Sequence, residues 1–127
     1  MAKKILVIED DPAISRLVDY SLKHEGYNVT TASNGLEGIR KAHYESPDLV
    51  ILDVMLPGMD GFEICHQLKS ESDTSKLPIL MFSAKAQEID KNTGRKVGAD
   101  DYLPKPAAPA DIVDRVGKLL QKKEIMS

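Results

Sequence analysis

The sequence predicts an α/β fold in which helices cover both faces of a parallel β-sheet. Short blocks of consecutive apolar residues recur along the chain, and each block is too short to be a helix. Continuous rather than alternating apolarity is typical of strands that are buried on both faces. The segments between the blocks have apolar residues at helical spacing. Strands that alternate with single helices form right-handed crossovers, so the sheet is expected to be parallel.

The apolar blocks define the expected strands. Residues 5–8, 49–52 and 79–82 are strongly apolar, residues 28–32 are weaker, and residues 102–103 form a short block before a proline. The order along the chain is strand then helix, five times over.

Five helices are expected between and after these strands. In the first, Ile14, Leu17, Val18 and Leu22 share one face, and Pro12 occupies the first turn with Asp11 near the N-cap. Apolar spacing predicts further helices at 36–42, 62–68 and 112–120, the last of them preceded by Pro109. A weaker stripe at 86–97, interrupted by Gly94, predicts the fourth helix in chain order.

The chain has room for one domain. Domains commonly contain about 100 to 150 residues, so 127 residues leave no space for a second catalytic domain. We therefore expect a single domain over 1–127. The polar residues 121–127 are expected to be a frayed tail or the start of a linker.

Charge and cysteine content exclude several functions. The 17 basic and 20 acidic residues give a net charge of −3, which argues against direct binding to nucleic acid. No apolar run approaches the length needed to span a membrane. The single cysteine, Cys65, forms no internal disulfide, and no secretory signal precedes the first charged residues, so a cytoplasmic location is expected.

Polar residues follow the expected strands at the points where they end. Because ligands of open α/β sheets bind beyond the carboxyl ends of the strands, these residues are the candidates for a functional site. They are Glu9, Asp10 and Asp11 after the first strand, Asp53 after the third, Ser83 after the fourth and Lys105 after the fifth.

The candidate residues have complementary chemistry. Asp10, Asp11 and Asp53 place three carboxylates beside one lysine, and hard oxygen ligands with uncompensated negative charge suit Mg²⁺. Asp53 stands alone at the centre of the sheet edge and is the candidate nucleophile, whereas Asp10 and Asp11 are candidate metal ligands. Lys105 is expected to pair with phosphate oxygens and Ser83 to donate one hydrogen bond to them.

These motifs, taken together and in order, resemble the receiver domain of two-component response regulators, over nearly the whole chain. The resemblance implies a flavodoxin-like fold, with a five-stranded sheet in the order 2-1-3-4-5 and five helices. The matching segments are Glu9-Asp10-Asp11, residues 53–61 (DVMLPGMDG), Ser83-Ala84 and Lys105-Pro106.

The resemblance also implies a role for each residue. Asp53 looks like the aspartate that accepts a phosphoryl group from a histidine kinase or phosphotransfer protein. Asp11, Asp53 and the Met55 carbonyl look like direct Mg²⁺ ligands, with Asp10 acting through water. Lys105 looks like the residue that contacts the phosphoryl group, in a Lys-Pro bond that is cis in this family. Ser83 and Tyr102 look like the switch pair that signals to a downstream output protein or domain, through the surface formed by the fourth helix, fifth strand and fifth helix.

The sequence departs from the family at a few positions. Ser83 replaces the commoner threonine, and Ala107 stands where a phenylalanine often follows the Lys-Pro step. Met55 and Lys85 border the expected route of an attacking water.

Several other interpretations remain open at this point. Tyr102 is alternatively a half-buried strand aromatic, and Cys65 is expected to be a core thiol. The three histidines, His24, His43 and His66, lack a spacing suited to metal ligation and are expected to be solvated.

Two rival functions share parts of this pattern. A flavin electron carrier needs a phosphate-binding loop rich in Ser, Thr and Gly where this chain has three acids. A phosphohydrolase with an aspartate nucleophile usually has a second acid two residues later, where this chain has Met55. Both rivals are therefore less favoured than a signalling domain that is not an enzyme in the ordinary sense.

Overall fold

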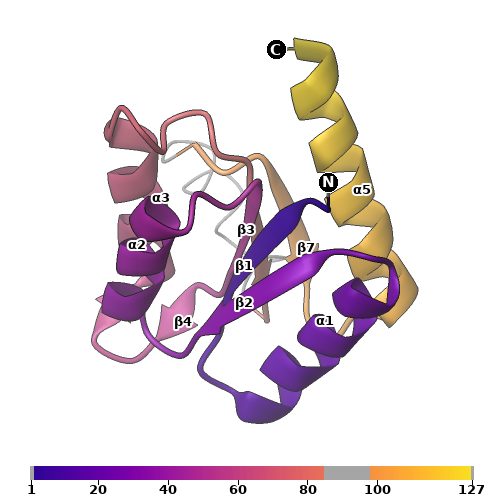
Figure 1. The fold of residues 1–127 in the computed structure, drawn as a ribbon. Coiled ribbons are helices and arrows are strands. Elements are labelled where there is room, and N and C mark those ends of the chain that lie inside the picture. The colour runs from indigo at the N-terminus through magenta and orange to yellow at the C-terminus, as the bar shows by residue number, and fades with distance from the viewer. Residues whose placement is uncertain (1, 85–97, 127) are drawn as a thin grey trace.

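A computed structural model describes residues 2–84 and 98–126 and shows one twisted parallel sheet between two layers of helices (Figure 1). The sheet has the order β2-β1-β3-β6-β7, with parallel pairing throughout. This is the expected order 2-1-3-4-5, so the fold prediction is confirmed. The strands are β1 (Lys4–Ile8), β2 (Asn28–Ala32), β3 (Leu49–Leu52), β6 (Ile79–Ser83) and β7 (Asp101–Pro104).

Helices cover both faces of this sheet. In the described part of the chain they are α1 (Pro12–His24), α2 (Gly35–Tyr44), α3 (Gly61–Ser70) and α5 (Pro109–Met126). The first and last pack on one face, and α2 and α3 pack on the other. The helix expected at 86–97 lies outside the described residues. No helix within the described ranges is long and apolar enough to cross a membrane.

The central strands contribute to two separate cores. Leu6 of β1 packs in the core beneath α2 and α3, whereas its neighbours Ile5 and Val7 pack in the core beneath α1 and α5. Successive side chains of a strand point to opposite faces, so a strand covered on both sides needs apolar residues at every position. This is why the apolar blocks are continuous.

A small hairpin follows β3 and was not predicted. Strand β4 (Met55–Leu56) pairs antiparallel with β5 (Met59–Asp60), and Gly58 between them has φ +75°. Two-residue strands are too short to produce a hydrophobic pattern in the sequence. The hairpin connects the residue after β3 to the start of α3.

The C-terminal helix is longer than expected. Residues 121–127 were expected to be a frayed tail or the start of a linker, and α5 continues through this segment to Met126. The Lys105–Pro106 peptide bond is cis, as the family resemblance implies.

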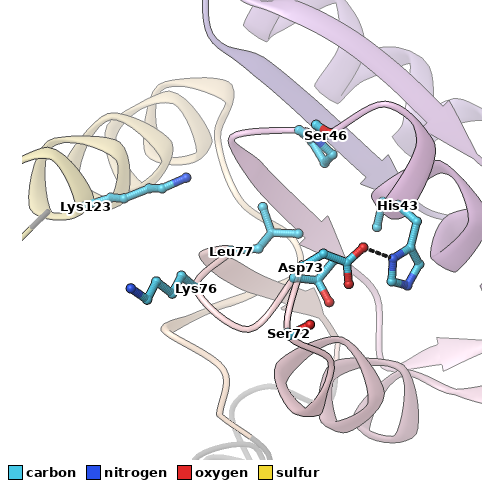
Figure 2. A pocket seen from close by; sticks show the side chains of 10 residues that line it. His43, Ser46, Ser72, Asp73, Lys76, Leu77 and Lys123 are labelled. Carbon is cyan, nitrogen blue, oxygen red and sulfur yellow. Dashed lines mark hydrogen bonds and ion pairs between the residues drawn. The ribbon is translucent and has the colours of Figure 1, made fainter.

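An ion-pair cluster joins the end of α2 to the loop before β6 (Figure 2). His43 Nδ1 lies 2.5 Å from Asp73 Oδ2, and this contact is the dashed line in Figure 2. His43 Nε2 lies 3.2 Å from Glu71 Oε1. Carboxylates accept hydrogen bonds, so only the doubly protonated imidazolium can donate to both. The hydrogen bond to Asp73 is the main reason why the pKa of His43 is raised above its ordinary 6.5, and the same bond lowers the pKa of Asp73 below 3.8. His43 is thus partly exposed, as expected, but it is also bonded to two carboxylates, which the sequence did not predict.

The His43 cluster predicts a pH-dependent contribution to stability. Because the pKa of His43 is higher in the folded protein, protonated His43 stabilises the fold. This contribution is fully present below pH 6.5 and is lost as the pH rises through the folded-state pKa. The ion pair also requires an ionised Asp73, so the contribution is lost again when the pH falls through the lowered pKa of Asp73. His43→Gln is therefore expected to reduce the free energy of unfolding more at pH 5.5 than at pH 8.5, by a small amount because the pair is largely exposed. Urea unfolding at both pH values measures this difference, and Asp73→Asn serves as the matched variant. Equal losses at the two pH values would contradict the assignment.

Candidate functional site

The predicted polar residues meet at the carboxyl edge of the sheet. Three backbone hydrogen bonds continue the strand pairing one residue beyond the strands: Glu9 N–H donates to Ala32 O at 2.9 Å, Asp53 N–H to Ile8 O at 3.1 Å, and Lys105 N–H to Ser83 O at 3.1 Å. The residues after β1, β3 and β7 are thereby held in the register of the sheet.

Lys105 connects two buried carboxylates. Its Nζ lies 2.6 Å from Glu9 Oε1 and 3.2 Å from Asp53 Oδ2. Glu9 is 4% exposed and Asp53 is 6% exposed, so water screens these charges poorly. The ammonium also lies 5.3 Å from the ring centroid of Phe82. Lys105 is therefore fixed with its charge directed at Asp53.

Burial and charge act in opposite directions on the pKa values of this group. Burial raises the pKa of the Glu9 carboxyl, although the hydrogen bond from Lys105 works against the shift. Burial by itself would lower the pKa of Lys105, but the hydrogen bond to Glu9 and the negative charges of Asp53 and Glu9 together outweigh it and raise that pKa. Lys105 consequently stays positively charged across the physiological pH range.

A third carboxylate completes an acidic cluster. Glu9, Asp10 and Asp53 each offer an oxygen, and these oxygens all lie within 4.8 Å of one another. Three carboxylates against the single ammonium of Lys105 leave an excess of negative charge. Hard oxygen donors with excess negative charge are the ligand set that Mg²⁺ prefers, and the residues present therefore suit this ion.

The structure does not bring Asp11 into this cluster. Asp11 Oδ1 accepts hydrogen bonds from the backbone N–H groups of Ala13 at 2.9 Å and Ile14 at 3.5 Å, so its carboxylate caps α1. The cap and the position of Pro12 in the first turn are confirmed. The resemblance implies that Asp11 is a direct metal ligand and that Asp10 acts through water, but the cap turns the Asp11 side chain towards the helix and leaves it outside the acidic cluster. The metal roles of Asp10 and Asp11 stay predictions.

The remaining predicted residues lie around the cluster. The backbone N–H of Met55 donates to Asp53 Oδ1 at 3.2 Å, and the Met55 side chain is 56% exposed. Ser83 is buried at the end of β6, and Tyr102 is buried in the neighbouring strand β7. Their roles as metal ligand and switch pair stay predictions. Lys85 lies outside the described residues.

Two functional features were missed by the sequence reasoning. Glu9 was among the candidates at the strand ends, but it was given no role, and its pairing with Lys105 was not predicted. Gly61 donates its backbone N–H to Val54 O at 2.8 Å, and a Cβ atom at position 61 would lie 2.3 Å from Asp53 O. No sequence pattern reports such a close backbone approach.

Cys65 behaves as expected of a core thiol. It is fully buried on α3, and burial raises its pKa to about 12. A thiol that is protonated and inaccessible is not nucleophilic.

The fold and the site define a class of protein. The family model described as the response regulator receiver domain matches residues 5–117, and the chain belongs to this family. Receiver domains are signalling domains of two-component systems rather than ordinary enzymes, and they interact with histidine kinases and output domains.

Individual relatives agree with this assignment. The alkaline phosphatase synthesis transcriptional regulatory protein PhoP of Bacillus subtilis (strain 168) is 48% identical over 125 residues, which are 98% of this chain and 51% of that protein. The chain therefore spans about half the length of this curated relative.

Solved structures show the same fold. A CheY-like response regulator receiver domain protein from Methanospirillum hungatei JF-1 superposes with a TM-score of 0.94 at 28% identity and full coverage of both chains. The receiver domain of the sensor histidine kinase PA1611 from Pseudomonas aeruginosa PAO1, with a magnesium ion coordinated in its active site cleft, gives a TM-score of 0.87 at 26% identity over 95% of this chain and 99% of that one.

Proposed function

We propose that this receiver domain is a phosphorylation-dependent switch in which Asp53 accepts a phosphoryl group from the phosphohistidine of a histidine kinase or phosphotransfer protein. The observation that supports this most directly is the contact between Asp53 and Lys105 within the acidic cluster. Asp53 has one oxygen near an ammonium and the other near a backbone N–H group, so its orientation at the edge of the sheet is fixed.

The proposed transfer forms one bond and breaks another. An oxygen of Asp53 forms a bond to phosphorus as the P–N bond to the donor imidazole breaks, and the leaving imidazole retains the electron pair. Lys105 neutralises part of the charge on the phosphoryl oxygens, which otherwise face the carboxylates of Glu9 and Asp10.

We propose that Mg²⁺ binds at the acidic cluster through Asp10, Asp53 and the Met55 carbonyl, with Glu9 acting through water. When bound, the ion supplies charge neutralisation and orientation for the phosphoryl group. The acidic cluster itself supports this assignment, as does the magnesium-bound receiver domain of PA1611.

Asp53→Asn is expected to take up no phosphoryl group from acetyl phosphate in the presence of Mg²⁺, because an amide is not a competent nucleophile. Intact-protein mass spectrometry measures the uptake. The matched control is Asp60→Asn, since Asp60 caps α3 by accepting from Phe62 N–H at 2.8 Å and asparagine caps equally well. The control is expected to be labelled like the parent, and undiminished labelling of Asp53→Asn would refute the assignment.

We further propose that Ser83 and Tyr102 report phosphorylation to a downstream output protein or domain. Ser83 ends β6 beside β7, the strand that contains Tyr102, and both side chains are buried. A phosphoryl group adds about 1.5 to 2 negative charges and strong acceptors, towards which a nearby hydroxyl is drawn. The surface that includes β7 and α5 is then the proposed output surface.

Ser83→Ala is expected to accept a phosphoryl group at Asp53 but to lose most of the response of Tyr102. NMR of the Tyr102 ring and amide, with beryllofluoride as the phosphoryl mimic, measures this response. Ser83→Thr retains the hydroxyl and is expected to retain the response. Full parental shift changes in Ser83→Ala would show that the hydroxyl does not couple the two residues.

A further inference from the structure

Two adjoining hollows lie at the amino edge of the sheet, opposite the acidic cluster. Their volumes are about 250 and 340 Å³. They are formed by the loop that precedes β3, the loop that precedes β6 and the last turns of α5. Figure 2 shows the first hollow, with Lys123 reaching towards it from α5, Leu77 in its wall, and His43 on its far side. Lys76 and Lys123 line both hollows, which places these two side chains at their common boundary.

The charge lining these hollows is unbalanced. Among the described residues, the only acids that line them are Asp73, which is bonded to His43, and Asp100, which is bonded to Lys69 Nζ at 2.9 Å and to a backbone N–H. Within the described ranges, the ammonium groups of Lys76, Lys122 and Lys123 have no hydrogen-bond or ion-pair partner. The paired groups cancel, so three positive charges remain uncompensated in a protein whose net charge is −3.

The second hollow also has an apolar wall. Pro78 and Leu119 line it beside Lys122 and Lys123, and both apolar residues are buried. A ligand that uses both features must combine a multiply charged anion with an apolar or aromatic body. Lysine ammonium groups bind phosphate as point charges, and several of them favour a phosphate or diphosphate over a singly charged carboxylate.

We propose that this edge of the sheet is a binding site for a small organic phosphate, with the phosphate groups between Lys76 and Lys123 and the body of the ligand against Pro78 and Leu119. The site is separate from Asp53 and does not depend on the function proposed for it. Its volume falls in the range of pockets that bind small molecules.

The test uses ADP as the probe and the full chain labelled with ¹⁵N. EDTA in the buffer keeps divalent cations from bridging a phosphate to the acidic cluster, and constant ionic strength separates site binding from general screening. ADP is expected to cause saturable amide shifts at residues 72–78 and 119–123. Pyrophosphate is expected to bind several-fold more weakly and adenosine not measurably, since each has only half of the chemistry.

Two variants show whether the lysines form a site. Lys76→Gln combined with Lys123→Gln is expected to lower the affinity for ADP at least about tenfold, since each removes a charge-assisted contact. Lys118→Gln is the matched control, because Lys118 is an exposed lysine of α5 that pairs with Asp114 at 3.0 Å and lies outside both hollows. The control is expected to bind ADP like the parent.

Four results would overturn the proposal. The first is amide shifts that fail to saturate by about 10 mM ADP, a concentration at which a site of millimolar affinity would be mostly filled. The second is a loss of ADP affinity in Lys118→Gln equal to that in the double variant. The third is equal affinities for pyrophosphate and ADP, and the fourth is amide shifts centred on the edge of the sheet that contains Asp53. The first two would indicate diffuse electrostatic attraction to surface lysines. The third would show that the organic body of the ligand adds no affinity, and the fourth would place the phosphate at the acidic cluster.

Discussion

Asp10→Asn is expected to abolish the stabilisation that Mg²⁺ gives to the folded protein. An ion that binds only the folded state at 100 times its Kd raises the free energy of unfolding by about 2.7 kcal/mol. Removing one of the three clustered carboxylates weakens the metal site. It also relieves the repulsion between the carboxylates, which is about 1 to 4 kcal/mol for two charges near 4 Å, depending on the local dielectric. The Tm of Asp10→Asn is therefore expected to rise without metal and to show no increase when Mg²⁺ is added.

The matched control is Asp11→Asn. Asp11 caps α1, and asparagine is as good an N-cap as aspartate, so α1 keeps its start. This variant is expected to retain the Mg²⁺-dependent increase in Tm. Thermal unfolding with EDTA and with Mg²⁺ compares the two variants directly. Loss of the Mg²⁺ response in Asp11→Asn, with retention in Asp10→Asn, would restore the assignment made from the sequence alone.

Gly61→Ala is expected to reduce the free energy of unfolding by about 3 kcal/mol or more, at the upper end of overpacking effects. The new Cβ would lie 2.3 Å from Asp53 O and 2.6 Å from Val54 Cα, and both are backbone atoms that cannot rotate away. If the variant folds, the backbone after β3 must move, and phosphoryl uptake from acetyl phosphate is expected to fall with it.

Gly117→Ala is the matched control: it is the same substitution, but here it is expected to raise the free energy of unfolding. Position 117 lies inside α5, and a Cβ there would have no neighbour within 4 Å. Alanine in place of a helical glycine is expected to stabilise the fold by about 0.5 to 1 kcal/mol. Urea unfolding of the two variants beside the parent measures both effects. A stable and fully active Gly61→Ala would contradict the close packing of Gly61 against Asp53.

The positions of the residues at the strand ends could be predicted because they follow from hydrophobic patterns within short segments of the sequence. An apolar block identifies a buried strand, and in a parallel sheet all carboxyl ends lie at the same edge. Asp53 and Lys105 are 52 residues apart in the chain, yet both were expected at this edge and are found 3.2 Å apart. The same reasoning identified Asp11 as the cap of α1, since an acid before Pro12 is a local signal.

The sequence by itself determined the layers, the order of the strands and the edge at which the polar residues gather, since these follow from hydrophobic periodicity, chain order and the resemblance to a family. Only the tertiary structure decided which acids share the cluster. Glu9, Asp10 and Asp11 are adjacent in the chain, and their side chains diverge because the strand register buries Glu9 against Lys105 while the first turn of α1 engages Asp11. The close approach of Gly61 to Asp53 and the bonding of His43 likewise depend on contacts between distant segments, which leave no periodic trace in the sequence.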